Sequence, residues 1–345
     1  MRGTPRRILV KEVNWLGDLV MSLPALWAVR HAYPDARLSV LVQSSLASFF
    51  DGLDWVDEVL PYTTPSGLWS HSAETLRVVR ALRARDFDLG IAFPRSFSAA
   101  LWLFLARIPC RAGVVADGRG WLLTHTARVD THDPTRHQSL AWLEMLDRSL
   151  AIPAAHAAPV FAAHPAHVRR MRAAVTDALG SVQRLVVLGP GAAYGPAKQW
   201  PTAHWVQLVA QLAQRDLGVV FAGGPREAEL CRHIAAQAGA PRTAVFAGQT
   251  SIGELCALLR LADAFVGNDS GASHLAAALG IATVAIFGST NPQRTAPQGP
   301  RVAVLYDPPP CSPCLARTCR YGHYDCLQRV RPEQVIAELA KLGAL

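Results

Sequence analysis

Asp18 stands where a carboxylate could act as a general base. It ends the segment Asn14-Trp15-Leu16-Gly17-Asp18, which follows an apolar run and precedes a helix-like pattern. A carboxylate in this place can accept a proton at the end of a strand, or it can cap the helix and complement its dipole. The sequence leaves both interpretations of Asp18 open.

A glycine- and proline-rich segment over residues 189–201 is predicted to bind an anion. Its glycines, among them Gly191, allow backbone N–H groups to approach a ligand, and Lys198 adds positive charge just before a helix-like pattern. The segment matches neither a Walker loop nor Gly-x-Gly-x-x-Gly. An ordinary turn with a surface lysine is the alternative, and the pattern favours a phosphate site.

A second anion-binding loop is predicted over residues 266–274. Glycine and polar side chains lie here between an apolar strand and an alanine-rich helix, a composition that packing does not explain. Ser270 and the N–H group of Gly271 can bind phosphate at the helix N-terminus, whereas Asp269 and His274 can hold sugar hydroxyls.

Glu227 follows the Gly-Gly-Pro turn at residues 223–225. A carboxylate after a tight turn can bind a ribose diol through two hydrogen bonds. It is also favourable in the first turn of any helix, so this signal is weak by itself.

Four of the seven cysteines lie within sixteen positions. Thiolates at such short spacing can hold zinc, although the paired Cys-x2-Cys signature is missing, and an uncoordinated cysteine-rich loop is slightly favoured. The clustered cysteines are Cys311, Cys314, Cys319 and Cys326.

Short apolar runs alternate with amphipathic ones along the chain, which predicts an α/β fold with parallel sheets. Strands are expected at 8–13, 38–42, 58–61, 89–93, 185–188, 218–222, 245–246, 264–266 and 283–287. Helices are expected at 19–32, 74–85, 98–106, 138–150, 203–214, 227–238, 252–261 and 273–279. Residues 152–166 are interpreted as a linker, which gives domains 1–160 and 161–330 and a C-terminal helix at 331–345.

Composition narrows the class of protein. Half of the 345 residues are apolar and only 17% are charged, which excludes intrinsic disorder. No apolar stretch is long and unbroken enough for a transmembrane helix or a signal peptide, so a cytoplasmic location is expected. The net charge of +8 has no dense basic run, which argues against nucleic acid as a partner and suits anionic ligands or a membrane surface. Of the three lysines, Lys11 and Lys341 are expected at the surface.

The sequence resembles glycosyltransferase family 9, the ADP-heptose:lipopolysaccharide heptosyltransferases. The resemblance covers nearly the whole chain and is greatest to the members that add the second inner-core heptose. It rests on Asn14-Trp15-Leu16-Gly17-Asp18-Leu19 with Leu23-Pro24-Ala25, on Gly195-Pro196-Ala197-Lys198-Gln199-Trp200-Pro201, and on Asn268-Asp269-Ser270-Gly271 with His274.

The resemblance implies a GT-B fold, in which two Rossmann-like domains with parallel sheets face a cleft. It implies transfer of L-glycero-D-manno-heptose from ADP-heptose, with inversion at the anomeric carbon, to the inner core of lipopolysaccharide. The acceptor would be an anionic lipid A–Kdo–heptose at the inner membrane, with the protein peripheral on the cytoplasmic face. No cofactor is required on this basis, and stimulation by Mg²⁺ and a structural zinc stay open.

By position, Asp18 would be the base that deprotonates the acceptor hydroxyl, Lys198 would neutralise the departing diphosphate, and Glu227 would hold the adenosine ribose. Arg95 and Arg119 are candidate acceptor contacts. The other substrate-binding positions would be Asn14, Gly17, Gly191, Tyr194, Asp269, Ser270, Gly271 and His274. Some relatives have hydroxyl residues where this chain has Ala192-Ala193, so backbone groups or Tyr194 must supply the phosphate contacts there.

Two alternatives stay open. Another family 9 transferase would keep the donor loops and use a different heptose acceptor or nucleotide sugar. A non-catalytic nucleotide-binding protein would have no use for Asp18 and would normally show Gly-x-Gly-x-x-Gly after its first strand, which this chain lacks.

Overall fold

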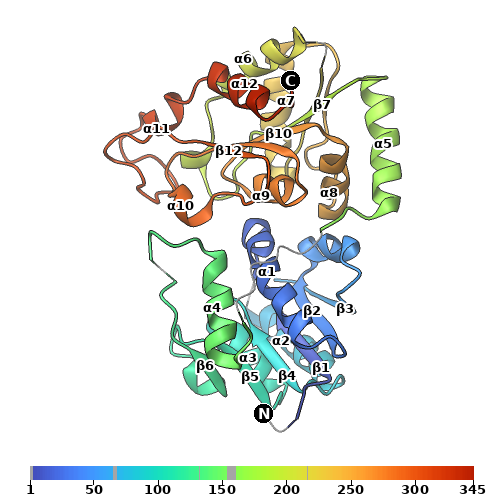
Figure 1. Cartoon of the computed structure of the whole chain (residues 1–345), viewed down its shortest axis with the longest axis vertical. Coiled ribbons are helices and arrows are strands. Elements are labelled where there is room, and N and C mark those ends of the chain that lie inside the picture. Colours follow the sequence, from blue (N-terminus) through green and yellow to red (C-terminus); the bar gives the residue numbers. More distant parts are fainter. Residues whose placement is uncertain (1–2, 65–67, 132, 154–160, 216) are drawn as a thin grey trace. The chain divides into compact units, whose positions relative to one another are not determined.

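The computed structural model describes residues 3–64, 68–131, 133–153, 161–215 and 217–345. The chain forms two compact units, unit 1 from Met1 to Val160 and unit 2 from Phe161 to Leu345. Each unit has its own six-stranded sheet covered by helices (Figure 1). The chain therefore builds two separate α/β cores.

Unit 1 is a doubly wound sheet with the strand order β3-β2-β1-β4-β5-β6, and every pairing in it is parallel. Its strands are β1 Arg7–Lys11, β2 Arg37–Gln43, β3 Glu58–Tyr62, β4 Leu89–Ala92, β5 Cys110–Val114 and β6 His125–Ala127. Its helices are α1 Leu16–Ala32, α2 Leu68–Arg83, α3 Phe97–Leu105 and α4 Ser139–Leu150, with 3₁₀ segments η1 Ser44–Gly52 and η2 Gly120–Leu122. Helix α1 packs against α4, and α2 packs against α3.

Unit 2 repeats this topology with the order β12-β11-β10-β7-β8-β9, again wholly parallel. Its strands are β7 Leu185–Gly189, β8 Gly218–Phe221, β9 Thr243–Val245, β10 Ala264–Asn268, β11 Ala282–Ile286 and β12 Val302–Leu305. Its helices are α5 Pro165–Leu179, α6 Thr202–Ala213, α7 Ala228–Ala238, α8 Ile252–Leu261, α9 Gly271–Ala278, α10 Pro292–Thr295, α11 Asp325–Gln328 and α12 Pro332–Lys341, with 3₁₀ segments η3 Pro196–Lys198 and η4 Pro225–Glu227. Helix α5 packs against α8, and α6 packs against α7 and α12.

The central strands are buried along their whole length because helices cover both of their faces, and they are apolar except for Asn268 in β10 and Thr283 in β11. Every residue of β7, β10 and β11 is buried, as continuous apolar runs in a parallel sheet require. Helix α12 belongs to this core, since its Val335 and Leu339 are fully buried. In both units the strand order reverses beside the first strand, between β1 and β4 and between β7 and β10. Loops at the carboxyl end of such a reversal form the usual ligand crevice of this fold.

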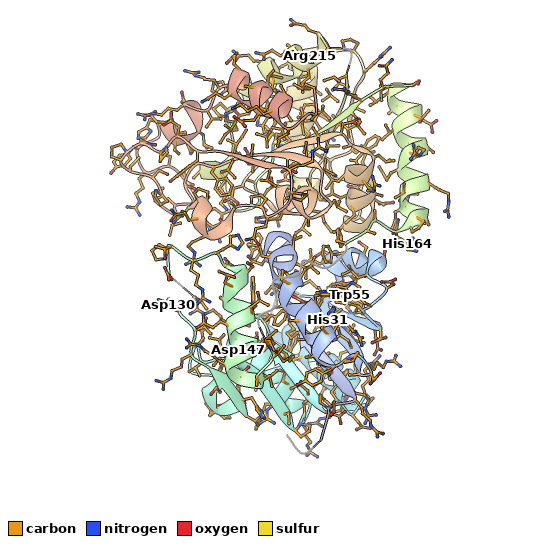
Figure 2. All side chains as sticks on the ribbon, viewed as in Figure 1. His31, Trp55, Asp130, Asp147, His164 and Arg215 are labelled. Carbon is orange, nitrogen blue, oxygen red and sulfur yellow. The ribbon has the colours of Figure 1, made fainter. Side chains whose placement is uncertain are left out.

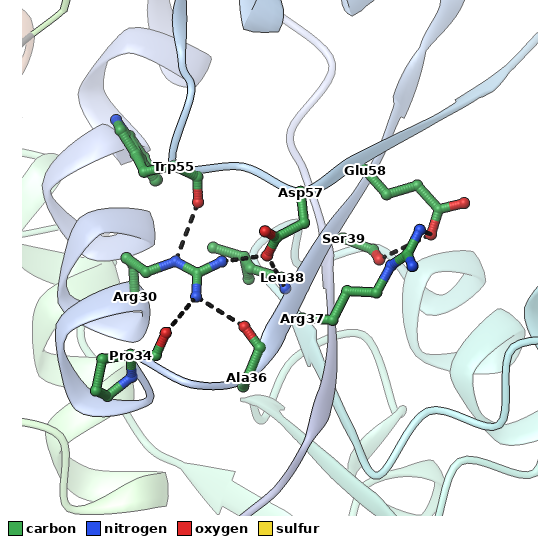
Figure 3. A network of polar contacts seen from close by, with 9 residues as sticks. All are labelled: Arg30, Pro34, Ala36, Arg37, Leu38, Ser39, Trp55, Asp57 and Glu58. Atoms are coloured by element: carbon green, nitrogen blue, oxygen red, sulfur yellow. Dashed lines mark hydrogen bonds and ion pairs between the residues drawn. The ribbon is translucent and has the colours of Figure 1, made fainter.

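At the opposite, amino edge of the unit 1 sheet, Arg30 near the end of α1 connects several segments by hydrogen bonds. Its guanidinium donates to the backbone carbonyls of Trp55 at 3.0 Å, Pro34 at 3.0 Å and Ala36 at 2.7 Å, and it pairs with Asp57 (Figure 3). One side chain thus ties the end of α1 to the starts of β2 and β3. A cavity of about 370 Å³, lined by Arg37 and Glu58 among others, lies at the same edge.

The predicted α/β alternation is confirmed, and each predicted strand and helix overlaps an observed one. Strands β5, β6 and β12 and helices α5, α10 and α11 were not predicted. Helix α5 begins at Pro165, inside the proposed linker, and His164 caps it by accepting the N–H of Ala166 at 3.3 Å (Figure 2). Its buried face repeats every four residues at Met171, Val175 and Leu179, a signal that the sequence did contain. Residues 154–160 of that linker lie outside the described part of the chain.

Candidate functional site

The predicted phosphate loop leaves β7 and returns into α6, and Asn268 at the end of β10 holds it in place. The Asn268 side chain is fully buried. Its Nδ2 donates to the carbonyl of Pro190 at 2.7 Å and more weakly to that of Gly191 at 3.3 Å, while its Oδ1 accepts the N–H of Trp200 at 3.0 Å. One amide therefore fixes both ends of the loop. Asn268 belongs to the Asn268-Asp269-Ser270-Gly271 motif, but the sequence alone indicated no role for its side chain.

Lys198 and Asp269, predicted separately, form a close ion pair. Lys198 Nζ lies 2.5 Å from Asp269 Oδ2, and this oxygen also accepts the hydroxyl of Thr290 at 2.6 Å. Asp269 is buried, and the Lys198 side chain is only 13% exposed. The ammonium therefore sits in a mostly dehydrated position, where an added anion would interact with it more strongly than in water.

Tyr194 packs beside this pair. Its ring lies under Lys198 Nζ at 4.8 Å and under the guanidinium of Arg317 at 5.1 Å. Its hydroxyl donates to the carbonyl of Leu315 at 2.6 Å. The single hydroxyl hydrogen is thus used within the protein, so Tyr194 positions two cations rather than donating to a phosphate. Arg317, which was missed from the sequence, enters the site by this contact.

Helix α9 begins at Gly271, two residues earlier than predicted, with Ser270 as its extended N-cap. The Ser270 side chain makes no capping hydrogen bond, and its hydroxyl lies 3.5 Å from that of Ser273 in the first turn. This end of the helix carries partial positive charge and suits an anion. His274 lies in the next turn and is buried. The carboxyl edge of β10 therefore gathers Asp269, Ser270, Gly271 and His274 beside Lys198.

Glu227 ends the 3₁₀ turn before α7, with one oxygen, Oε2, accepting the N–H of Gly224 at 2.7 Å. Burial raises the pKa of its carboxyl, against the opposing effect of that N–H. The side chain lies directly against Gly191, where a Cβ would come within 2.0 Å of Glu227 Oε1. The two predicted donor-site residues are thus adjacent at the carboxyl edge of unit 2.

In unit 1, Asp18 lies in the first turn of α1, whose N-cap is Trp15. Asp18 is therefore not the N-cap, because the helix begins at Leu16 rather than Leu19, but as an acidic residue of the first turn it does complement the helix dipole. One carboxylate oxygen accepts a hydrogen bond from Nε2 of Gln138, at 3.0 Å. Gln138 is the residue that precedes α4. Gly17 stands beside Asp18 in the same turn. Gln138 lies 120 positions away in sequence, and no local pattern signals it.

Lys11 is buried at 3% exposure, so its predicted surface position is wrong. Its Nζ donates to the carbonyl of Glu12 at 2.5 Å and to Asn14 Oδ1 at 3.2 Å, and it lies 4.7 Å from the ring centre of Tyr62. The Tyr62 hydroxyl donates to the same Asn14 oxygen at 2.6 Å. Burial lowers the pKa of Lys11 to about 7, against an opposing attraction to Glu12. Asn14, itself exposed, is therefore held by the buried Lys11 and Tyr62 at the start of the loop that ends in Asp18.

Glu12 points the other way, because successive residues of an extended chain face opposite sides. Its Oε2 accepts the hydroxyl of Ser22, on α1, at 3.1 Å and the N–H of Val13 at 3.2 Å. Its Oε1 has no hydrogen-bond partner among the described residues. Burial raises the pKa of Glu12 to about 7, against opposing effects of the Val13 N–H, Ser22 and Lys11.

Arg119, a candidate acceptor contact, is fully buried. Its guanidinium donates to the carbonyls of Val114 at 3.0 Å, Pro94 at 2.5 Å and Ser96 at 2.9 Å. The expectation of an accessible arginine is wrong here, because this side chain instead fastens two loops of unit 1 to each other.

The four clustered cysteines line one cavity of about 280 Å³ together with His323 and Tyr324. In the described part of the chain, no three His, Cys, Asp or Glu side chains are arranged to hold a metal ion. Hydrogen bonds from backbone N–H groups, first that of Tyr324, lower the pKa of Cys319. Burial and the nearby Cys314, Cys319 and Cys311 raise the pKa of Cys326 to about 11. The cysteines converge, but not at metal-binding geometry.

This cysteine segment folds over the carboxyl edge of the unit 2 sheet. The N–H of Leu315 donates to the carbonyl of Ser289 at 2.8 Å, and the N–H of Ala197 donates to that of Arg317 at 3.0 Å. The segment is therefore packed against the Lys198 turn.

Comparison with known proteins points to one family. A family model described as "Glycosyltransferase family 9 (heptosyltransferase)" matches residues 75–325. Lipopolysaccharide heptosyltransferase 2 of Salmonella typhimurium is 29% identical, over 97% of this chain and 98% of that protein. Lipooligosaccharide heptosyltransferase 2 of Campylobacter jejuni is 27% identical, over 98% and 99%.

Solved structures agree with the predicted fold class. That of Escherichia coli ADP-heptose lps heptosyltransferase II matches with a TM-score of 0.83 and 25% identity, over 97% of this chain and 98% of that one. A glycosyl transferase family 9 protein from Veillonella parvula matches with a TM-score of 0.85 at 21% identity, over 98% and 97%. The α/β prediction with two Rossmann-like units of the GT-B type is confirmed.

Proposed function

The chain belongs to glycosyltransferase family 9, and from this we propose that it transfers L-glycero-D-manno-heptose from ADP-heptose to the inner core of lipopolysaccharide, as the second heptose and with inversion. The observation that carries the proposal is the buried Lys198–Asp269 pair beside the N-terminus of α9. A mostly buried cation beside the N-terminus of a helix suits a diphosphate leaving group.

Charge development explains what unit 2 does. As the anomeric carbon–oxygen bond breaks, the bonding electron pair stays on ADP, whose negative charge rises, while the sugar ring becomes positive. The ammonium of Lys198 forms an ion pair with the carboxylate of Asp269. Its ammonium stabilises the departing diphosphate more than the bound one, so it lowers the barrier as well as aiding binding. Glu227, beside Gly191, is placed to accept hydrogen bonds from the adenosine ribose.

Unit 1 supplies the base. We assign proton removal to Asp18. Its second carboxylate oxygen takes the proton of the acceptor hydroxyl while the oxygen of that hydroxyl attacks the anomeric carbon. Gln138 donates to the other oxygen and fixes the direction of the carboxylate. Attack opposite the departing ADP inverts the configuration.

Asp18→Asn is the test of this assignment. The amide keeps the shape but cannot take the proton, so turnover of ADP-heptose with an inner-core acceptor should fall by ~10²–10⁴-fold. ADP binding by calorimetry should stay unchanged. Asp147→Asn, at an exposed carboxylate on α4 (Figure 2), is the matched control and should retain activity. Near-normal turnover of the Asp18 variant would place the base elsewhere.

The choice of donor and acceptor needs its own experiment. Rates with ADP-heptose should exceed those with UDP- and GDP-sugars, and an acceptor with one heptose should be preferred to one with none. Preference for another nucleotide sugar or acceptor would favour a different family 9 activity. ADP binding without turnover of any pair would favour the non-catalytic alternative.

Location follows from the acceptor. None of the described helices is both long and apolar enough to span a bilayer. We propose peripheral association with the cytoplasmic face of the inner membrane, where the anionic lipid A–Kdo–heptose acceptor is anchored. Nucleic acid is not a proposed partner.

No cofactor is needed for this scheme, and Mg²⁺ would act only by screening the diphosphate. For the cysteine cavity an uncoordinated loop stays slightly favoured, and zinc binding by Cys311, Cys314, Cys319 and Cys326 is the alternative to test, because all four thiols line one space. The side chains would have to close in to reach the roughly 2.3 Å of a zinc–sulfur bond. Metal analysis should then find about one zinc per chain, and Cys314→Ser should release it and lower the melting temperature while ADP binding persists. Metal-free protein with four titratable thiols would exclude zinc.

A further inference from the structure

Unit 1 exposes a group of large apolar side chains at one place. Phe97 and Phe104 on α3 are each 40% exposed, Val115 is 41% exposed, and Trp121 in η2 is 66% exposed. The Trp121 ring centre lies 5.8 Å from that of Phe104 and 6.4 Å from that of Phe97. Val115 lies against Gly120, next to Trp121. These four side chains form one contiguous patch, called the aromatic patch below, and such patches mark interaction sites more often than scattered apolar residues do.

The aromatic patch is not needed to complete a core. The residues of α3 that face the protein are Ala99, Ala100 and Leu103, and all three are buried. Leu122, next to Trp121, is buried against Ala100. The exposed rings are therefore a second, outward face of a helix and turn that are already packed.

Arg119 holds the aromatic patch rigid. Its bonds to the carbonyls of Val114, Pro94 and Ser96 tie the turn that carries Trp121 to the loop that leads into α3. A fully buried arginine is a costly fastening unless it is well hydrogen-bonded. The three carbonyl contacts of Nε and Nη1 offset part of that cost, while Nη2 has no partner among the described residues. They join the turn that carries Trp121 to the loop that leads to Phe97.

The surroundings of the aromatic patch are basic. Residues 93–128 contain five arginines, no lysine and no glutamate, and Asp117 is their only acidic residue. The Arg111 guanidinium stacks over the Phe104 ring at 5.4 Å, and Arg107 follows in the turn after α3. Aromatic rings with arginines at their rim match the headgroup zone of an anionic bilayer, where rings lie among lipid chains and cations meet phosphates.

The aromatic patch also begins at the edge of the sheet that carries the proposed base. Helix α3 follows β4 and η2 follows β5, so both leave the carboxyl edge from which β1 runs into Asp18. A surface here could hold unit 1 where a membrane-anchored acceptor presents its sugar.

We propose that the aromatic patch docks unit 1 onto an anionic lipid surface, with Trp121 at the centre and Arg107 and Arg111 at the rim. The proposal rests on the proposed function, since that function requires a lipid-anchored acceptor. A second copy of the chain suits the patch poorly, because a two-fold contact would bring the same arginines face to face and four side chains cover less area than a stable dimer needs.

Co-sedimentation with vesicles tests the docking. The intact protein should bind vesicles of phosphatidylcholine with phosphatidylglycerol, and binding should fall about tenfold or more for Phe97→Ser with Trp121→Ser, since two rings leave the lipid. Arg107→Gln should weaken binding to anionic vesicles and make it less sensitive to salt. Tyr321→Ser, at a 70% exposed aromatic residue of unit 2, is the matched control and should bind normally. Equal binding by the double variant and the intact protein would overturn the proposal, as would a dimer in solution that the double substitution abolishes.

Activity separates this proposal from the function on which it rests. With a deacylated, water-soluble acceptor the double variant should turn over at the normal rate. With the acceptor embedded in vesicles its KM should rise while kcat holds. Loss of activity on the soluble acceptor would overturn the docking role, because it would place the patch in the active site. Vesicle binding that depends on the patch in a protein inactive on every acceptor would support docking and count against the heptosyltransferase function.

Discussion

The two units bury charged side chains beside the first strand of equivalent sheets, but they treat those charges differently. In unit 2, Lys198 and Asp269 come from loops after β7 and β10 and neutralise each other directly. In unit 1, Lys11 and Glu12 are neighbours on opposite sides of one strand end, and each is partnered by neutral groups. A charge that is buried without a direct counter-ion shifts its pKa instead. Unit 2 thus pairs its buried charges directly, whereas unit 1 holds two groups whose pKa burial moves to about 7.

Breaking the unit 2 pair should have the largest effect. Lys198→Ala removes the charge that we propose stabilises the departing ADP, so kcat should fall by about 10²–10³-fold, with weaker ADP binding. It also leaves Asp269 buried and unpaired, which should destabilise the fold by ~3–5 kcal/mol. Rates and urea denaturation measure the two effects.

A paired substitution separates them. Lys198→Ala with Asp269→Asn should recover stability, because no buried charge is left alone, while kcat stays low. Recovery of both stability and rate would mean that Lys198 only balances Asp269 and does not act on the diphosphate.

Unit 1 should show its difference as a pH effect on stability. The pKa of Glu12 is raised from 4.5 to about 7, so the folded state binds its proton more tightly than the unfolded state does. This contribution to stability is fully present below pH 4.5 and is lost as the pH rises through 7. Glu12→Gln should therefore remove a decline of up to about 3 kcal/mol in the free energy of unfolding across that range. Urea denaturation of both proteins at several pH values measures it.

Lys11→Met is the matched variant with the opposite sign. Burial lowers the pKa of Lys11 from 10.5 to about 7, so its contribution is present above pH 10.5 and is lost as the pH falls through 7. Parallel pH profiles for the intact protein and both variants would contradict the picture of two separately buried groups.

Asn268 should give the smallest of these effects. Asn268→Asp keeps the acceptor for the Trp200 N–H but loses the donors to Pro190 and Gly191, which should destabilise unit 2 by about 1–3 kcal/mol and weaken ADP binding. Gln214→Ala, at an exposed amide after α6, should change stability by no more than ~0.5 kcal/mol. Equal effects of the two would mean that the loop does not depend on Asn268.

The sequence predicted those parts of the fold and site that depend on local patterns. Apolar runs gave the central strands, and the glycine-rich turns located Gly191, Lys198 and Ser270 at strand ends. It missed what depends on contacts between distant residues. Gln138 reaches Asp18 across 120 positions. Arg317 joins Tyr194 from the cysteine segment.

Burial of charged side chains was the other failure. Lys11 and Arg119 were expected to be accessible because such residues usually are. Lys11 is enclosed because it continues the inward face of β1, two residues after the fully buried Leu9. Arg119 is enclosed because three carbonyls at loop ends need a donor. The burial of Lys11 and Arg119 depends on contacts that form only when the strands and loops pack together, so the sequence does not indicate it.

The contact between Gly191 and Glu227 bears on how this site could evolve. Any side chain at position 191 would occupy the space of the Glu227 carboxylate, 2.0 Å away. A side chain gained at 191 would therefore displace the Glu227 carboxylate, the group that we propose binds the adenosine ribose, whereas a shorter residue at 227 would leave room for it. Substitutions at 191 are thus expected to depend on the residue at 227, and a change of nucleotide preference by this route would involve both positions.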